Sequence, residues 1–535
     1  MVRVVRVVTV AAGVFAAGHL GELTQWAPFE LVDDLLVQTG RVPRRLRDLP
    51  SRAGVYFVLA LGLFPGLGYA RVWGKLTAGL GGLAVAAPSE KALRDLRRRL
   101  GPAPLKALFE VLAGPLAWPH APGVRFMGLR TVAFDGCSST RVPDTDRNRA
   151  WLGRVRHRQG FAGYPLVHLM TLAETGTRGL LGAVTAAAAD GTETALAARL
   201  LHLLGEGMLV LMDRGFDSGP FLAAVAGTGA DFLVRAKASR SPLVLETLPD
   251  GSYLAEISGL RVRIIEARVM VTGAGGSRTG DSYRLITTLL DHRRFPAARL
   301  VRLYHERWEI ESAYYALRHT LLQGRVLRSG DRPGLEQEIW ALLALYQLLR
   351  MAMTDAVAAL PGTDPDRASF TTALETAREQ VTAAQGIICD PAGPGAIARA
   401  VQAALLPARR PRYSARKVKS STSRYPGRGD DPRPALPAII TAVGITICPP
   451  PPGTRHSRPA ARRRRSSGPG TRRYQVTALM TASPHRTWTA AELAARLSLP
   501  HRDLAAQLRG WARTGLLTRT SPATYTLPPP PRTPP

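Results

Sequence analysis

Two aspartates, far apart in the sequence, each follow an apolar run that is typical of a buried β-strand. Asp135 comes after the run 132–134 and Asp213 after the run 209–212, and a glycine follows each aspartate within two residues. A carboxylate at a strand end is an accessible ligand, and glycine lets the backbone or a bound group approach closely. One such aspartate more often caps a turn, but two in the same arrangement indicate a shared site.

A third acid, Glu311, lies on a helix that the apolar spacing predicts from about 297 to 321. At 3.6 residues per turn it shares one face with Tyr304, Arg307 and Arg318, because separations of three, four and seven residues return to the same side. An ordinary surface helix with an ion pair between Arg307 and Glu311, four residues apart, explains the same pattern. Glu311 by itself therefore does not decide between a site and a solvated face.

Three carboxylates from distant segments suit phosphoryl transfer. Two Mg²⁺ ions roughly 3.5 to 4 Å apart can activate a water or a 3′ hydroxyl and stabilise the leaving oxygen, and hard oxygen ligands hold such ions. Mn²⁺ prefers the same ligands and can substitute. Nearby arginines can hold the flanking phosphates. A glycoside hydrolase also needs paired carboxylates, but it gives no reason for the charge of this chain.

The chain is strongly basic, with 71 lysines and arginines against 40 aspartates and glutamates, a net charge of +31. Such an excess indicates a polyanionic partner, most simply nucleic acid. Residues 401–475 hold 17 of the basic residues and only two acids, Asp430 and Asp431. This clustering argues against a basic surface that has no partner.

The three cysteines, Cys137, Cys389 and Cys448, lie too far apart for the paired spacing of a zinc site or a disulfide framework. The apolar run 53–70 is interrupted by Pro65 and four glycines, so it predicts a buried helical hairpin rather than a membrane span. We therefore expect a cytoplasmic, nucleoid-associated protein that has no membrane partner.

The hydrophobic pattern divides the first two thirds of the chain into two predicted domains. Helical spacing with a proline at each break predicts a helical N-terminal domain over 17–118. Apolar strands that alternate with helices predict an α/β catalytic core over 124–360. Within the core, period-two alternation predicts a β-rich insertion over 238–292, and a second long helix is expected at 335–359.

The last third has a different composition. Residues 408–475 are rich in proline, arginine and serine, which predicts a basic linker without fixed structure. Residues 476–527 regain an apolar pattern, with a capping box of Thr489 and Glu492 opening a helix. Two helices followed by a terminal hairpin predict a winged helix-turn-helix. A small helical hairpin with no DNA role remains the alternative.

At these residues the sequence resembles the DDE transposases of the insertion sequence 4 family. The family helix reads Tyr, two residues, Arg, three residues, Glu, six residues, Lys. Tyr304, Arg307 and Glu311 match it in register, and Arg318 stands in place of the lysine. Both aspartate-bearing strand ends and the β-rich segment match as well. The resemblance covers about residues 17–428.

The resemblance implies a ribonuclease H-like catalytic core interrupted by the β-rich insertion and preceded by a helical DNA-binding domain. It implies a transposase that cleaves and joins insertion-sequence ends by cut-and-paste transposition. Its partners would be double-stranded DNA, as terminal inverted repeats and as target, with a homodimer acting on the DNA. The alternative function is a catalytically silent DNA-binding regulatory protein derived from a transposase.

The resemblance also assigns roles to residues. It makes Asp135, Asp213 and Glu311 the catalytic, metal-binding acids, and it implies contacts to the transposon end from Tyr304, Arg307 and Arg318. The chain departs from the family in two respects. Cys137 stands where threonine is common, and no tryptophan lies between 214 and 307 to stack a flipped base. A hairpin intermediate is therefore left open.

Overall fold

The structure is a computed structural model of the 535-residue chain. It divides into two compact units, residues 1–455 and 456–535, and each is described by itself. The residues described are 7–9, 15–42, 49–118, 120–153, 156–157, 160–161, 163–273, 276, 278–386, 394–408, 440–450, 472–484, 486–499, 501–513, 516–521 and 524–527.

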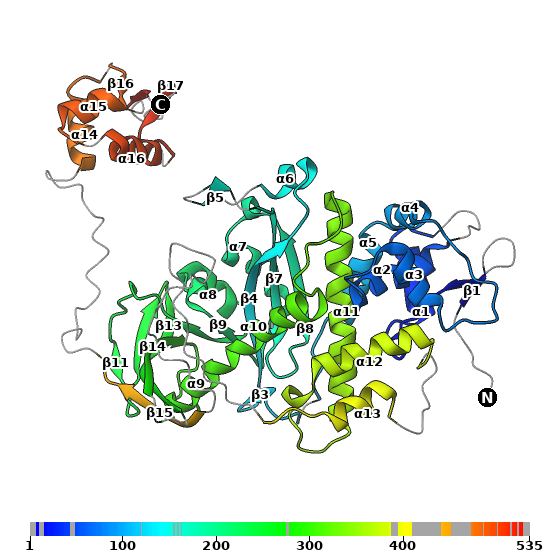
Figure 1. Cartoon of the computed structure of the whole chain (residues 1–535). Coiled ribbons are helices and arrows are strands. Elements are labelled where there is room, and N and C mark those ends of the chain that lie inside the picture. The colour runs from blue at the N-terminus through cyan, green and yellow to red at the C-terminus, as the bar shows by residue number, and fades with distance from the viewer. Residues whose placement is uncertain are drawn as a thin grey trace, which may run out of the picture. The chain divides into compact units, whose positions relative to one another are not determined.

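The first unit begins with two short strands and five helices (Figure 1). These elements are β1 (Val7–Thr9), β2 (Phe15–Ala17), α1 (Phe29–Gln38), α2 (Ser51–Leu63), α3 (Tyr69–Thr77), α4 (Glu90–Leu100) and α5 (Ala103–Leu112). Nearly every residue of α2 is buried, as expected of a helix that is apolar on all sides. After α2 ends at Leu63, the chain turns at Pro65 and continues as α3, which packs against α2. The predicted helical hairpin is thereby confirmed.

The long helix α11 (Arg332–Ala358) joins these helices to the rest of the unit. It packs against α2 and α5 on one side and against α12 (Phe370–Ala383) and α13 (Ala396–Ala403) on another. Among the described residues, α11 is the one helix long and apolar enough to cross a membrane, but 78% of its apolar window is buried inside the protein. The helices therefore share one hydrophobic core with one face of the sheet.

The centre of the unit is a mixed sheet in which five strands follow the order β8-β7-β4-β9-β10. Strands β4, β9 and β10 are parallel to one another, whereas β7 and β8 are antiparallel to their neighbours. The strands are β4 (Leu129–Arg141), β7 (Leu166–Glu174), β8 (Leu180–Ala186), β9 (Met208–Met212) and β10 (Asp231–Arg235), with β3 (Arg125–Phe126) paired on β4. These strands confirm the predicted α/β class.

The β-rich segment continues the same sheet, because β14 (Arg278–Thr287) pairs antiparallel with β10. Beyond it lie β13 (Leu260–Gly273), β12 (Tyr253–Ile257) and the short β11 (Glu246–Thr247). The period-two alternation in the sequence therefore corresponds to strands that extend the core sheet.

One further strand corrects the predicted linker at 408–475. Ile440–Cys448 forms β15, which pairs antiparallel with β13 along the edge that β12 also uses. The side chains of Val443, Ile445 and Ile447 pack against the core, because alternate residues of a strand point to the same face. Residues 409–439 and 451–471 of the predicted linker lie outside the described residues.

Two layers of helices cover the two faces of the central sheet (Figure 1). α7 (Glu193–Ala198) and α8 (Gly219–Ala226) pack on the face that carries Phe134 and Met212. α9 (Ala297–Tyr304) and α10 (Trp308–Tyr315) pack on the opposite face. The ends of β4 and β9 therefore lie between helices from both layers.

The predicted helix 297–321 is not α-helical throughout. Between α9 and α10 the chain makes a 3₁₀ turn, His305–Arg307, and after α10 it continues as a π-helical segment, Ala316–Leu321. Neither a 3₁₀ turn nor a π-helix has 3.6 residues per turn. The single stripe predicted for Tyr304, Arg307, Glu311 and Arg318 therefore does not persist along the segment.

The second unit has its own core, formed around Trp488, Leu493, Leu504 and Leu508. Its elements are α14 (Arg472–Thr481), β16 (Trp488–Thr489), α15 (Ala490–Arg496), α16 (His501–Arg513), β17 (Thr518–Ser521) and β18 (Thr524–Thr526). The three strands form an antiparallel sheet in the order β16-β18-β17. The predicted capping box at the start of α15 is present. The winged helix-turn-helix stays a prediction.

Candidate active site

The parallel pairing of β4 with β9 brings the two aspartates together. Asp213 directly follows β9, as predicted, but β4 continues to Arg141, so Asp135 lies within its strand and does not end it. Ala133 is aligned with Leu211 in this ladder, so the same register two residues further on places Asp135 beside Asp213. Asp135 lies on the same side of β4 as Ala133 and Cys137, which face the core shared with α10. The predicted pair of acids is thus formed by adjacent strands.

Short backbone hydrogen bonds fix both aspartates. Oδ1 of Asp135 accepts from the N–H of Gly136 at 2.9 Å, and Oδ1 of Asp213 accepts from the N–H of Gly215 at 2.7 Å. A β-carbon placed on Gly215 would lie only 2.9 Å from the same Asp213 oxygen. Glycine at 215 therefore permits the close turn that orients this carboxylate.

Glu311 reaches the site from α10, and Arg307 accompanies it. Nη2 of Arg307 donates to Oε1 of Glu311 at 3.2 Å, with 7% of the arginine side chain exposed against 41% of the glutamate. The ion pair expected of a surface helix is therefore present, but its arginine is buried. The same guanidinium acts electrostatically on Asp135 and Asp213, so all three predicted acids and Arg307 belong to one cluster.

The cluster holds more negative charge than Arg307 offsets. Burial raises the pKa of Asp135 to about 7; Arg307 opposes this effect, while Glu311 and Asp213 add to it. A carboxyl group whose pKa is raised in this way is destabilised in its charged form. The arrangement favours the binding of a cation.

Tyr314, which was not predicted from the sequence, attaches α10 to the middle of β4. Its hydroxyl donates to the carbonyl oxygen of Asp135 at 2.7 Å and lies 2.9 Å from Oγ1 of Thr171 on β7. The side chain is buried. Apolar periodicity assigns such a tyrosine to the core, and only the structure shows that its hydroxyl holds the backbone of the site.

A fourth acid, Glu193, was also missed. A β-carbon placed on Gly136 would lie 3.1 Å from its Oε1, and one on Gly215 would lie 3.4 Å from its Oε2. Burial and, after it, the charge of Asp213 raise the pKa of Glu193. In the sequence this residue reads as an ordinary acid in the first turn of a helix.

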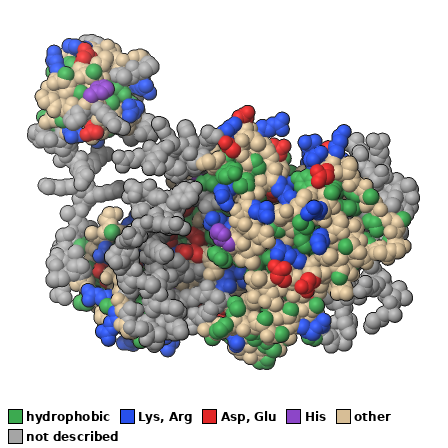
Figure 2. Space-filling view, viewed as in Figure 1, with side chains coloured by type: hydrophobic (Ala, Val, Ile, Leu, Met, Phe, Trp, Pro, Cys, Tyr) green, Lys and Arg blue, Asp and Glu red, His purple; other side chains and the backbone are tan. Residues whose placement is uncertain are grey.

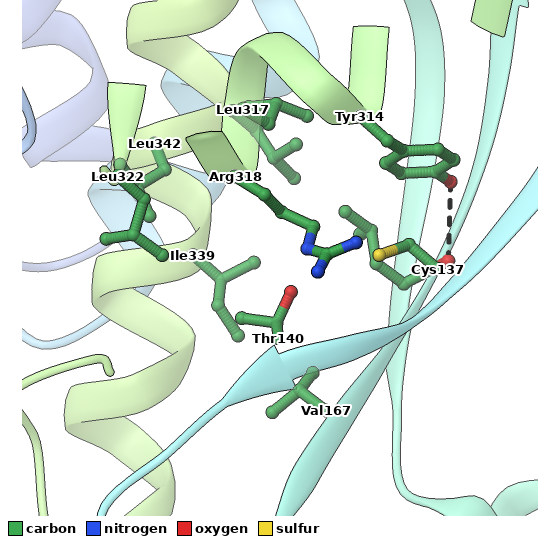
Figure 3. A pocket seen from close by; sticks show the side chains of 11 residues that line it. Cys137, Thr140, Val167, Tyr314, Leu317, Arg318, Leu322, Ile339 and Leu342 are labelled. Atoms are coloured by element: carbon green, nitrogen blue, oxygen red, sulfur yellow. Dashed lines mark hydrogen bonds between the residues drawn. The ribbon is translucent and has the colours of Figure 1, made fainter. Parts of the chain in front are cut away.

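The remaining predicted residues lie around the acids in different settings. Tyr304 is buried on α9 with its ring edge-on to Tyr283, and burial is the main cause that raises its pKa to about 12. Arg318 lies on the π-helical segment, and its side chain points toward Cys137 and Thr140 near the end of β4 (Figure 3). Arg318, Cys137 and Thr140 line a largely apolar pocket. Arg318 therefore lies beside this pocket and not in the acidic cluster.

Comparison with known proteins gives concordant matches. Residues 17–110 match the family described as "Insertion element 4 transposase N-terminal", and residues 129–348 match "Transposase DDE domain". The chain is 29% identical over 419 residues to the "Transposase InsG for insertion sequence element IS4" of Escherichia coli (strain K12), covering 74% of this chain and 91% of that protein.

This chain belongs to the insertion element 4 family of DDE transposases. The resemblance expected from the helix motif and the strand ends is thereby confirmed, and so is a DNA transposase function. A solved structure, the piggyBac transposase synaptic complex with hairpin DNA, is also similar, at 9% identity and a TM-score of 0.39 over 76% of this chain and 87% of that one. Similarity at that level does not establish a shared fold.

The surface of this transposase agrees with a DNA partner. In the face shown in Figure 2, lysine and arginine side chains are spread widely and are not gathered into one patch. In the sequence, residues 401–475 carry 17 basic residues and two acids, so about half of the net charge of +31 lies elsewhere in the chain. A broad positive surface attracts the phosphate backbone without reading its sequence.

Proposed function

We propose that this transposase cleaves and joins the ends of its insertion sequence with Asp135, Asp213 and Glu311 as the acids that hold two divalent metal ions. The observation that carries the proposal is the convergence of these three carboxylates at the middle of β4 and the end of β9, with only partial compensation by Arg307. Mg²⁺ is the expected metal, and Mn²⁺ can substitute for it.

The donor set fits these ions. Carboxylate oxygens are the hard ligands that Mg²⁺ and Mn²⁺ prefer. Among the described residues, no group of three or more His, Cys, Asp or Glu side chains is already arranged as a metal site. Bound ions would activate the attacking oxygen and stabilise the leaving oxygen of the phosphodiester. Burial and the charges of Glu311 and Asp213 raise the pKa of Asp135, so a bound cation would stabilise the charged form of this carboxylate.

The neighbouring residues of the chain position these acids. Arg307 holds one oxygen of Glu311, and Tyr314 fixes the backbone of Asp135 against α10. Because Arg307 is buried beside all three acids, we assign it a positioning role within the site in addition to the contact with the transposon end that the family motif implies. Tyr304 and Arg318 remain proposed contacts to the transposon end.

The strand order supports a ribonuclease H-like core. Counted along the chain, β4, β7, β8, β9 and β10 give the order 3-2-1-4-5, with the first three strands antiparallel and the last two parallel to the first. The segment from β11 to β14 enters between β10 and α9, which is the place of the proposed β-rich insertion.

We further propose that the partner is double-stranded DNA, bound by a homodimer at terminal inverted repeats and at the target. The helical N-terminal region and the C-terminal unit would supply additional DNA contacts. A second site on a flexible tether raises avidity without changing the chemistry. The C-terminal unit would therefore increase affinity for long DNA and leave cleavage unaffected.

The decisive experiment incubates the purified chain with labelled DNA from both ends of its element and Mg²⁺. Nicked or joined products are expected from the parent. Asp135→Ala, Asp213→Ala and Glu311→Ala should each abolish them, a loss of at least about 10³-fold if charge stabilisation in the transition state is removed. Glu206→Ala, an exposed acid before β9, is the matched control and should cleave normally.

Two other outcomes have clear meanings. A triple alanine variant that cleaves as well as the parent would show that these acids are not the catalytic ones. A parent chain that binds the ends in a gel shift but yields no product with either Mg²⁺ or Mn²⁺ would favour the catalytically silent regulator.

A further inference from the structure

The two glutamates near the strand ends come from opposite faces of the sheet. Glu311 belongs to α10, whose buried residues pack with Ala133 and Cys137 on one face. Glu193 begins α7, whose buried residues pack with Phe134 on the other face. The middle of β4 and the adjacent end of β9 are therefore approached by one carboxylate from each helical layer.

Two glycines leave the space that Glu193 occupies. Residue 136 points toward the α7 face, because side chains alternate along β4 and Asp135 points the other way. A β-carbon on Gly136 would meet Oε1 of Glu193 at 3.1 Å and Cε of Met170 at 3.2 Å, both closer than ordinary contact. Oε2 of Glu193 faces Gly215 at the turn that orients Asp213. The carboxylate therefore lies between the middle of β4 and the turn that follows β9.

The start of α7 holds this carboxylate in place. Thr192 caps the helix, with its Oγ1 accepting from the N–H of Ala195 at 3.3 Å. Glu193 is consequently the first helical residue, and α7 packs against the turn Arg214–Phe216 that follows Asp213. Glu193 is exposed to solvent, but the cap at Thr192 and the nearby Gly136 and Gly215 restrict where its carboxylate can lie.

We propose that Glu193 is a fourth acidic ligand of the divalent-metal site, on the Asp213 side and opposite Glu311. This inference rests on the proposed function, since it requires that the site binds metal. An acid that served only to start α7 would point its carboxylate at the free N–H groups of the first turn. The carboxylate of Glu193 instead lies within reach of the groups that carry Asp135 and Asp213.

The test is metal binding by the full chain, measured from the electron paramagnetic resonance signal of free Mn²⁺ during titration. Glu193→Gln keeps the shape of the side chain and removes its charge. We expect its Mn²⁺ affinity to fall by about tenfold or more, as for loss of a group that tunes a metal site. Glu206→Gln, an exposed acid at the other end of β9, is the control and should bind Mn²⁺ as the parent does.

Melting temperatures in EDTA separate a metal ligand from a structural residue. Removal of a carboxylate that is repelled by Asp213 should leave the melting temperature of the metal-free protein unchanged or raise it, while the increase caused by Mn²⁺ shrinks. Gly136→Ala, which displaces the carboxylate without changing its charge, should weaken Mn²⁺ binding in the parent but add nothing in the Glu193→Gln background. Additive effects would overturn the proposal even if Glu193→Gln reduced binding.

Asp213→Asn distinguishes the two proposals. If the parent and Asp213→Asn bind Mn²⁺ equally, or the parent binds none, the metal site of the proposed function is wrong. If Asp213→Asn loses binding and Glu193→Gln keeps it, only the role of Glu193 is rejected.

Discussion

The acidic site of the first unit and the capped helix of the second place carboxylates in opposite settings. The side chain of Asp135 is half-buried beside Glu311 and Asp213, and desolvation there raises its pKa to about 7. Glu492 lies on the surface, where its carboxylate accepts the N–H of Thr489 at 2.8 Å, and this hydrogen bond is the main cause that lowers its pKa. One carboxylate is held at a cost in stability, and the other stabilises its helix.

This difference separates a residue that serves a ligand from one that serves the fold. A protein keeps a destabilised charge where another molecule will compensate it, so functional acids concentrate at such places. The capping box needs no partner outside its own turn. The variants below test the contrast, beginning with the largest expected effect.

Asp135→Asn should stabilise the metal-free protein at high pH. An acid whose folded pKa is about 7 and whose unfolded pKa is 3.8 lowers stability as pH rises from about 4 to 7, and the full penalty persists above pH 7. Between pH 5 and pH 8 the stability of the variant relative to the parent should increase by about 2 to 3 kcal/mol. Urea unfolding in EDTA at both pH values measures this change, and a pH-independent difference would contradict the buried charge.

The same contrast shows what the sequence alone could predict. Asp135 and Asp213 were predictable because each ends an apolar run, and two parallel neighbouring strands then bring them together. Glu193 was not, because an acid after Thr192 at a helix start has a sufficient local explanation. Its meaning depends on Gly136, which lies 57 residues away in the chain.

Two errors of the fold have similar causes. Strand β15 lies in a proline- and arginine-rich region whose average composition concealed the alternation at 443–447. The stripe through Arg318 assumed a regular α-helix, but the π-helical segment turns its residues away from that period. An average composition over a long window misses a short strand, and a fixed helical period misses a short π-helical segment. Both features depend on contacts with distant parts of the chain.

Arg318→Ala tests whether the arginine beside the site contacts DNA although it lies outside the acidic cluster. Loss of one phosphate contact should reduce the slope of log affinity against log salt by about 0.9 and weaken end binding roughly tenfold near 0.1 M salt. Arg318→Lys should restore most of the binding, because it keeps the charge. Arg302→Ala, an exposed arginine on α9, is the control. A parental salt slope in Arg318→Ala would argue that its side chain only packs against Cys137 and Thr140.

Thr489→Ala is the smallest change and tests the other half of the contrast. Oγ1 of Thr489 accepts the N–H of Glu492 at 3.2 Å and donates to Oε2 of Glu492 at 3.0 Å. The substitution removes both bonds and leaves the one from the N–H of Thr489 to Glu492. The second unit has a hydrophobic core of its own, and a fragment of residues 456–535 is therefore a suitable sample.

Loss of the cap should destabilise the fragment by about 1 kcal/mol, seen as a lower midpoint of thermal unfolding. Thr477→Ala is the matched control, because Thr477 lies within α14 and its hydroxyl donates to the carbonyl of Arg473 four residues earlier. Alanine is favoured inside a helix, so this control should be neutral or slightly stabilising. Since Glu492 interacts with Thr489 and Arg486 of the second unit, Thr489→Ala in the full chain should leave DNA cleavage at the parental rate. A large loss of cleavage would mean that the folded second unit takes part in the reaction.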